Sequence, residues 1–257
     1  MKFILLSDLH LGASPYATAR LEAALADVRA KHADAEHIFL LGDLSDRGAI
    51  EDYSTLKQML TTCQTPATLL LGNHDDRDAF RTVFPSAFRH GGQWAQGLVQ
   101  IGAGVPAYVL DSLDAGQVGG SLDEGRLDML EHWLGEADKP GFLMLHHPPM
   151  PLGLPAYDAG PIVDGERLRS LIRHFREKLL AVFFGHCHMP ISGVIDGVPA
   201  LCVPALAAPS LPIFHRAAYA TDCGGAGGYG VVLLSPNSVV LHRVSLPDLA
   251  REPGQPG

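Results

Sequence analysis

Short runs of apolar residues recur along most of the chain, and each run ends in polar residues or glycine. A short apolar run bounded in this way is typical of a strand that is buried on both faces. On this pattern we interpret six segments as strands, at residues 3–6, 37–41, 67–71, 108–110, 142–145 and 181–184. Between them, apolar residues recur with helical spacing at residues 17–30, 51–60, 122–134 and 166–175. Alternating strands and helices predict an α/β fold in which helices cover a sheet.

The pattern changes after His188, where short apolar runs follow one another without helices between them. We interpret these runs as a second, antiparallel sheet packed on the first, with strands at residues 193–195, 198–203, 230–234 and 239–242. The last residues are rich in proline, which disfavours regular structure. We therefore expect a single domain over residues 1–246 and a flexible C-terminal tail over 247–257.

Composition narrows the possible partners of this 257-residue chain. Its 19 Lys and Arg against 28 Asp and Glu give a net charge of −9, which disfavours binding to a nucleic acid polymer or an anionic membrane. No apolar run approaches the ~20 residues of a membrane span, and the N-terminus lacks the apolar core of a signal peptide. The four cysteines form no CxxC pair, so neither a thiolate metal site nor a disulfide framework is indicated. We expect a cytoplasmic protein.

Residues of the types that bind metals follow five of the expected strands. The segments are Asp8-Leu9-His10, Gly42-Asp43-Leu44-Ser45-Asp46, Gly72-Asn73-His74-Asp75, His146-His147 and Gly185-His186-Cys187-His188. The carboxyl ends of parallel strands meet at one edge of a sheet, so these side chains should converge. In extended chain, residues two apart point to the same side, which would pair Asp8 with His10 and His186 with His188. Oxygen and imidazole donors without Cys suit two ions of Fe, Mn or Zn.

Each segment alone is a weak signal. An Asp-x-His sequence arises by accident at polar strand ends, and Gly-Asn-His-Asp is also a common kind of turn. Five segments that all stand at expected strand ends are difficult to explain as turns and accidents. Their joint occurrence favours a metal site.

The five segments, in this order, resemble the signature of the calcineurin-like metallophosphoesterase superfamily, which reads D-x-H, G-D-x-x-D, G-N-H-D, H and G-H-x-H. The resemblance extends from Phe3 to about Pro204. Residues 146–153, and residues 110–113 followed by 120–122, are similar to one branch of the superfamily. That branch contains bacterial glycerophosphodiesterases and class III cyclic nucleotide phosphodiesterases.

The resemblance implies a four-layer αββα sandwich of two mixed sheets flanked by helices, and a homodimer or higher homo-oligomer. It also implies that Asp8, His10 and His188 bind a first metal, while Asn73, His146 and His186 bind a second. Asp43 would bridge the two ions. His146 rather than His147 is the implied ligand, because relatives with one histidine here place it two residues before the proline.

The implied activity is that of a dinuclear metal-dependent phosphodiesterase acting on a small substrate, either a glycerophosphodiester or a cyclic nucleotide. A metal-bound hydroxide would attack the phosphorus, since two ions can lower the pKa of bound water. His74 is placed to contact the phosphate or protonate the leaving alkoxide, with Asp75 or Asp46 fixing its ring. The alternatives are a phosphomonoesterase or nuclease of the same superfamily and, disfavoured by the intact ligand set, a non-catalytic metal-binding scaffold.

Three features leave the substrate open. Some relatives place a further histidine near residues 204–209, where this chain has none, and His215 is a candidate replacement. Arg47 and Arg77 follow the ligand segments and suit either a phosphate or, as we favour, salt bridges with Asp46, Asp75 or Asp76. The proline-rich loop at residues 148–161 is expected to form a wall of the substrate cleft.

Overall fold

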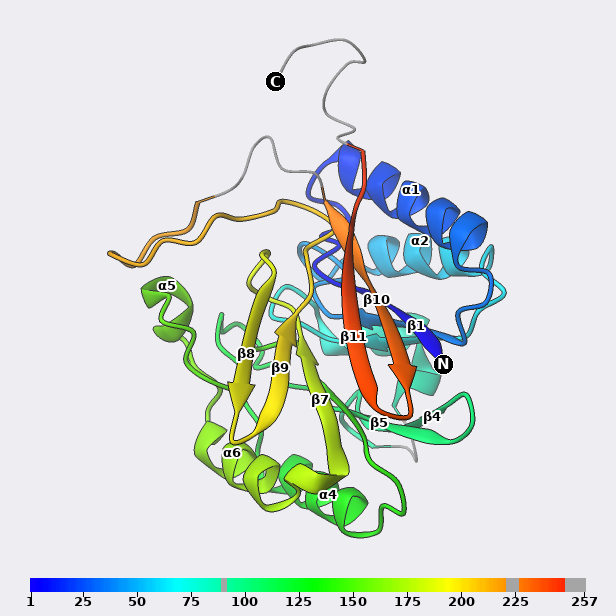
Figure 1. Cartoon of the computed structure of the whole chain (residues 1–257). Coiled ribbons are helices and arrows are strands. Elements are labelled where there is room, and N and C mark those ends of the chain that lie inside the picture. Colours follow the sequence, from blue (N-terminus) through cyan, green and yellow to red (C-terminus); the bar gives the residue numbers. More distant parts are fainter. Residues whose placement is uncertain (89–91, 221–226, 248–257) are drawn as a thin grey trace.

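Two mixed sheets form the centre of the protein, which is described here by a computed structural model over residues 1–88, 92–220 and 227–247 (Figure 1). In the first sheet, β1, β2 and β3 are parallel, and the β10–β11 hairpin adds antiparallel to β1. Its strand order is β11-β10-β1-β2-β3. The strands are β1 (Lys2–Leu6), β2 (His37–Leu41), β3 (Ala67–Leu70), β10 (Gly228–Ser235) and β11 (Ser238–Ser245).

In the second sheet, β5, β6, β7 and β9 are parallel, and β4 and β8 pair antiparallel at its two edges. The order is β4-β5-β6-β7-β9-β8. The strands are β4 (Gly97–Ile101), β5 (Val105–Val109), β6 (Gly141–Met144), β7 (Leu179–Phe184), β8 (Ile191–Ile195) and β9 (Val198–Cys202). The sheets pack face to face through a buried cluster in which the ring of Phe3 contacts those of Phe142 and Phe183.

Helices cover the outer face of each sheet. On the first sheet, α1 (Pro15–Lys31), α2 (Ile50–Leu60) and α3 (Arg77–Val83) bury residues such as Leu21 and Leu56. On the second, α4 (Glu124–Gly135) and α6 (Gly165–His174) bury Leu127 and Leu168 in a separate core. Figure 1 shows these two helices together at the lower end of the view. The short α5 (Pro155–Asp158) and two 3₁₀ helices, Pro85–Ala87 and Arg176–Lys178, complete these elements. The implied αββα sandwich is therefore confirmed.

The expectation that the late strands form a sheet of their own is wrong. β8 and β9 extend the sheet of β5–β7, whereas β10 and β11 extend the sheet of β1–β3. The antiparallel strands of the first sheet therefore come from the C-terminal part of the chain, after all strands of the second sheet. Lys2 of β1, for example, pairs with Leu233 of β10. The elements β4, α3 and α5 and both 3₁₀ helices were not expected from the pattern. The tail expected at 247–257 lies outside the described residues beyond Pro247.

Within the described ranges, no helix combines the length and the apolar character that crossing a bilayer would need.

Candidate metal centre

The expected metal-binding residues lie at the carboxyl ends of β1, β2, β3, β6 and β7. The convergence involves parallel strands of both sheets rather than one, which corrects the single-sheet expectation. Backbone hydrogen bonds continue past the strand ends, so that Leu9 N and His10 N both donate to the Asp43 carbonyl. On the other sheet, Gly185 N donates to the His146 carbonyl. The ligand-bearing loops are therefore extensions of rigid sheets.

One group of donor atoms comprises Asp8, His10, Asp43 and His188, whose candidate ligand atoms all lie within 4.8 Å of one another. The Nε2 atoms of His10 and His188 are 3.0 Å apart. Asp8 Oδ1 lies 3.5 Å from His188 Nε2, and Asp43 Oδ2 lies 3.6 Å from His10 Nε2. Imidazole nitrogens and carboxylate oxygens at these distances can surround one cation.

A second group adjoins the first through Asp43. His146 Nε2 lies 3.4 Å from Asp43 Oδ2 and 3.3 Å from Asn73 Oδ1. The same Asn73 oxygen lies 2.9 Å from His186 Nδ1. Asp43 Oδ2 is thus within 3.6 Å of an imidazole nitrogen in each group.

Hydrogen bonds outside the centre orient three of the four imidazoles. The Nδ1–H of His146 donates to the Leu41 carbonyl at 2.7 Å, and that of His188 donates to the Ala208 carbonyl at 2.8 Å. His10 Nδ1 lies 3.2 Å from Asp46 Oδ1. Such contacts fix the tautomer and direct the Nε2 lone pair inward, as second partners of metal-binding histidines do. The two carbonyl partners carry no side-chain signal and could not be found from the sequence.

The backbone at the candidate ligands differs from the extended chain that we assumed. Asp8, His10, Asp43, His186 and His188 have φ between 45° and 69°, in the left-handed region that non-glycine residues seldom adopt. Asp8 and His10, and likewise His186 and His188, do face the same centre. They do so because of these turns, and not because alternate residues of an extended strand point to the same side. The residues between them, Leu9 and Cys187, are buried in the two outer cores.

Two observations show that this donor set fits metal ions. Asp8 Oδ2 is buried and has no hydrogen-bond partner among the described residues, which is costly unless something else binds it. Gly72 lies against the centre, where an added Cβ would overlap Asp43 Oδ1 and lie 2.7 Å from His146 Nε2. A Cβ on Gly42, whose φ is +93°, would lie 2.5 Å from His146 Nδ1. The backbone thus approaches the centre as closely as glycine permits.

Charges are strongly coupled within the second group. Burial by itself lowers the pKa of His146, but the Asp43 carboxylate raises it to about 9. Burial likewise opposes ionisation of Asp43, yet His146 holds the pKa of this carboxyl well below its usual range. Burial, aided by the charge on His146, lowers the pKa of His186 to about 4. At neutral pH without metal, His146 and Asp43 therefore form an ion pair beside a neutral His186.

Metal binding at pH 7 is expected to release about one proton per chain, because a ligating imidazole must be neutral. His146 carries the proton that is lost, and its pKa of about 9 means that metal affinity should rise as the pH increases towards 9. Titration calorimetry with Mn²⁺ in buffers of different ionisation enthalpy measures this release. A binding enthalpy independent of the buffer would contradict the His146–Asp43 pair.

His74 lies beside the first group, with its ring centroid 4.6 Å from that of His10. Its side chain is 41% exposed, so a substrate can reach it. The Nδ1–H donates to the Asp46 carbonyl at 2.9 Å, which leaves Nε2 available. Of the two residues considered for fixing the ring, Asp46 is therefore the one in contact. Asp75 instead accepts hydrogen bonds from Gly72 N, the Tyr53 hydroxyl and other groups.

His147 lies beside the second group, and one of its ring nitrogens is within 4.8 Å of candidate ligand atoms of His146 and His186. Its Nδ1 lies 2.8 Å from Ser112 Oγ, and a Cβ on Gly120 would lie 2.7 Å from the same nitrogen. Asp111 accepts two hydrogen bonds from the Arg77 guanidinium. The segments at 110–113 and 120–122, which resemble one branch of the superfamily, thus hold His147 in place. The His147 ring in turn packs against those of His146 and His186.

The remaining candidates lie around the centre. Arg47, whose side chain is 91% exposed, lies 3.5 Å from Asp46, which confirms the expected salt bridge. Arg77 also forms a salt bridge, but with Asp111 rather than with Asp46, Asp75 or Asp76. His215 is exposed and belongs to none of the candidate metal groups among the described residues. In the loop at 148–161, the Tyr157 ring lies 5.7 Å from that of His186, which places this loop beside the centre.

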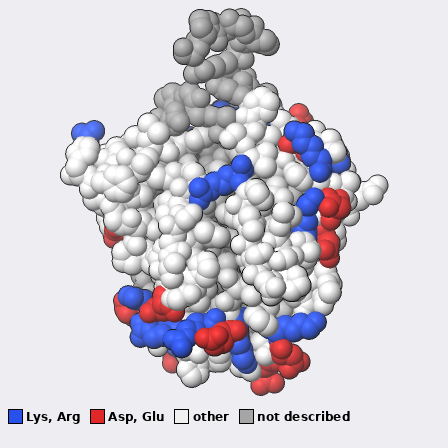
Figure 2. Space-filling model, viewed as in Figure 1, with Lys and Arg blue, Asp and Glu red and all other residues white. Residues whose placement is uncertain are grey.

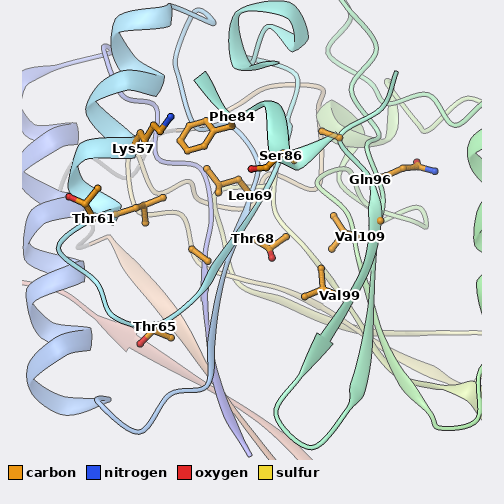
Figure 3. Close-up of a pocket in the computed structure, with 15 residues that line it drawn as sticks. Lys57, Thr61, Thr65, Thr68, Leu69, Phe84, Ser86, Gln96, Val99 and Val109 are labelled. Atoms are coloured by element: carbon orange, nitrogen blue, oxygen red, sulfur yellow. The ribbon is translucent and has the colours of Figure 1, made fainter. Parts of the chain in front are cut away.

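A cavity of about 360 Å³ lies apart from the centre, near the β3 edge of the first sheet and the β4–β5 hairpin of the second (Figure 3). Lys57, Thr68 and Gln96 are among its lining residues, and the Lys57 ammonium donates to the Val83 carbonyl. No expected metal ligand lines it.

Known proteins that are similar to this chain are named as enzymes that act on phosphoesters. A probable cyclic nucleotide phosphodiesterase of Rhodopseudomonas palustris is 36% identical over 211 residues, which cover 77% of this chain and 76% of the relative. The glycerophosphodiester phosphodiesterase GpdQ of Enterobacter lignolyticus is 32% identical over 154 residues, covering 59% and 55%. A purple acid phosphatase from yellow lupin superposes with a TM-score of 0.68 at 14% identity, covering 95% of this chain and 51% of that one, and shares the fold.

The sandwich and the convergent Asp, Asn and His donors define a metal-dependent phosphoester hydrolase. The sequence profile of the calcineurin-like phosphoesterases matches residues 1–190, and the chain belongs to that family.

Proposed function

We propose that the protein is a dinuclear phosphodiesterase that hydrolyses a small phosphodiester, either a cyclic nucleotide or a glycerophosphodiester. Asp8, His10 and His188 would bind one ion of Fe, Mn or Zn, and Asn73, His146 and His186 would bind the other. The position of Asp43 Oδ2, 3.6 Å from His10 Nε2 and 3.4 Å from His146 Nε2, carries the proposal, because one oxygen can then serve both ions. The names of the two enzymes similar to this chain support the two substrate classes.

Bound at this centre, the ions would supply Lewis acidity and lower the pKa of a water molecule so that it can attack phosphorus. The residues of the chain do the rest. The carbonyls of Leu41 and Ala208 keep the imidazoles of His146 and His188 oriented, and His74 donates a proton through Nε2 to the departing oxygen. The Asp46 carbonyl, which accepts the His74 Nδ1–H at 2.9 Å, holds the ring so that Nε2 is free to face the substrate.

Elemental analysis followed by a substrate panel tests this proposal. About two metal ions per chain are expected. After reconstitution with Mn²⁺, Zn²⁺ or Fe²⁺, cleavage of bis(p-nitrophenyl) phosphate and of cAMP or glycerophosphocholine should exceed that of p-nitrophenyl phosphate. Rapid monoester cleavage with failure on every diester would contradict the diesterase assignment and favour a phosphomonoesterase. Location in the cytoplasm and a homo-oligomeric state remain predictions from the sequence.

A further inference from the structure

A larger cavity, of about 750 Å³, opens next to the metal centre between β8, the end of β11 and the loop at residues 204–214. We call it the β8–β11 cavity. His188 lines it, so the cavity and the first group of donors share a residue. The Ser210 N–H donates to the His188 carbonyl at 2.9 Å, and the His188 ring donates to the Ala208 carbonyl at 2.8 Å. The cavity wall and this candidate ligand are therefore held together.

The wall of the β8–β11 cavity is mostly apolar. Met189, Ile191, Leu154 and Leu211 contribute to it, together with Phe214. Leu211 is 50% exposed and Phe214 is 67% exposed, which is unfavourable for large apolar side chains unless a ligand covers them. In the view of Figure 2, charged side chains gather over α6 and α4 and near α1, and leave most of the middle of this face uncharged. Exposed apolar residues that line a cavity of roughly 300–1,000 Å³ are typical of small-molecule sites.

One cationic side chain, Arg243, contributes to this wall. It donates to Ser192 Oγ at 2.9 Å, and no carboxylate within the described ranges forms an ion pair with it. On the same side of the molecule, Arg169 and Arg173 are both paired with Asp196. An unpaired guanidinium beside an aromatic side chain can stack on a flat ring or donate to its polar edge.

We propose that the β8–β11 cavity binds one alcohol arm of the phosphodiester and selects a flat aromatic or heteroaromatic arm over glycerol or choline. The inference rests on the proposed function and adds the subsite that sets its selectivity. A flat ring would cover Phe214 and Leu211 and meet Arg243, whereas glycerol would bring hydroxyls against an apolar wall with few partners, which is unfavourable. Because His188 both lines the cavity and belongs to the first donor group, an arm in the cavity would lie next to a phosphate held at the metal centre.

The test uses three diesters with the same p-nitrophenolate leaving group and a different second arm, which is methyl, phenyl or the 5′-oxygen of thymidine. The metal-loaded enzyme is expected to cleave the phenyl and thymidine esters with kcat/KM at least about tenfold above the methyl ester, the magnitude that an apolar subsite commonly supplies. The difference should appear in KM more than in kcat, because binding in the cavity is retained as the leaving group departs.

Two substitutions localise the effect. Phe214→Ala should reduce the preference for both large arms about fivefold or more, and Arg243→Met should reduce the preference for thymidine more than that for phenyl. Val194→Ala is the matched control, because Val194 is also 67% exposed, lies on β8 and does not line the cavity. Saturation-transfer NMR of free thymidine with the holoenzyme measures binding without turnover, and the signal should weaken in Phe214→Ala.

The possible failures are distinguishable. If no diester is cleaved, the proposed function itself is wrong. If all three are cleaved at similar rates, or if neither substitution changes the preference, the diesterase assignment stands and the cavity assignment is overturned. A change of oligomeric state in Phe214→Ala, measured by light scattering, would also overturn it, since a second copy of the chain would then cover the cavity.

Discussion

Asp43→Asn is expected to reduce the metal content from about two ions per chain to one or fewer, and kcat/KM for a diester by at least about a thousandfold. The side chain is buried, and its Oδ2 lies between the two donor groups. Asn keeps the shape and the oxygen that accepts the His74 N–H, but it removes the charge that attracts both ions. Elemental analysis and steady-state kinetics on the same preparation measure both effects.

The control for Asp43→Asn is Asp34→Asn, which also removes one carboxylate charge. Asp34 is 70% exposed and pairs with Lys2, away from the centre. The Asp34→Asn variant should retain both metal ions and full activity. Two ions and activity within tenfold of the wild type in Asp43→Asn would show that Asp43 does not join two sites.

His74→Ala is expected to reduce turnover of a diester with an alkyl leaving group by about 10²- to 10⁴-fold while the metal content stays unchanged. His74 contacts the candidate ligands through its ring and its backbone, but its Nε2 is available for the substrate. An alkoxide needs a proton as it departs, whereas p-nitrophenolate leaves readily without one. The loss should therefore be much smaller for bis(p-nitrophenyl) phosphate.

Comparison of the two leaving groups separates proton donation from a general disturbance of the site. His132→Ala, on the exposed face of α4, is the control and should change neither rate. Equal losses for both leaving groups in His74→Ala would contradict the proton-donor role. Loss of metal from that variant would instead make His74 part of the metal-binding shell.

The apolar runs located most strands because a strand buried between two layers has few polar positions. The segment 37–41 coincides with β2, and the helix expected at 51–60 starts one residue after α2 does. Which strands pair was harder to predict, because pairing depends on contacts between distant parts of the chain. The β10–β11 hairpin has the same local pattern as β8 and β9, yet it adds to β1. β4 was missed since it is only five residues long and its apolar run is interrupted by Gln100.

The candidate site was predictable to the extent that it depends on residue type and order. The seven expected ligands lie in two adjacent groups that share Asp43, and His74 lies beside them. The left-handed backbone at Asp8 and His186 was not predictable, since aspartate and histidine adopt it in a minority of positions and no local pattern marks which ones. The roles of Ser112 and of the Ala208 carbonyl depend on side-chain and backbone directions that spacing does not specify.

The left-handed turns at Asp8, His10, Asp43, His186 and His188 place candidate metal ligands at the expense of folding stability. Each such non-glycine residue costs roughly 1–3 kcal/mol, which the packed sheets must offset. Glycine at any of these positions would relieve that cost and remove a donor at the same time. A search for thermostable variants would therefore tend to recover well-folded, inactive proteins with changes at these five positions.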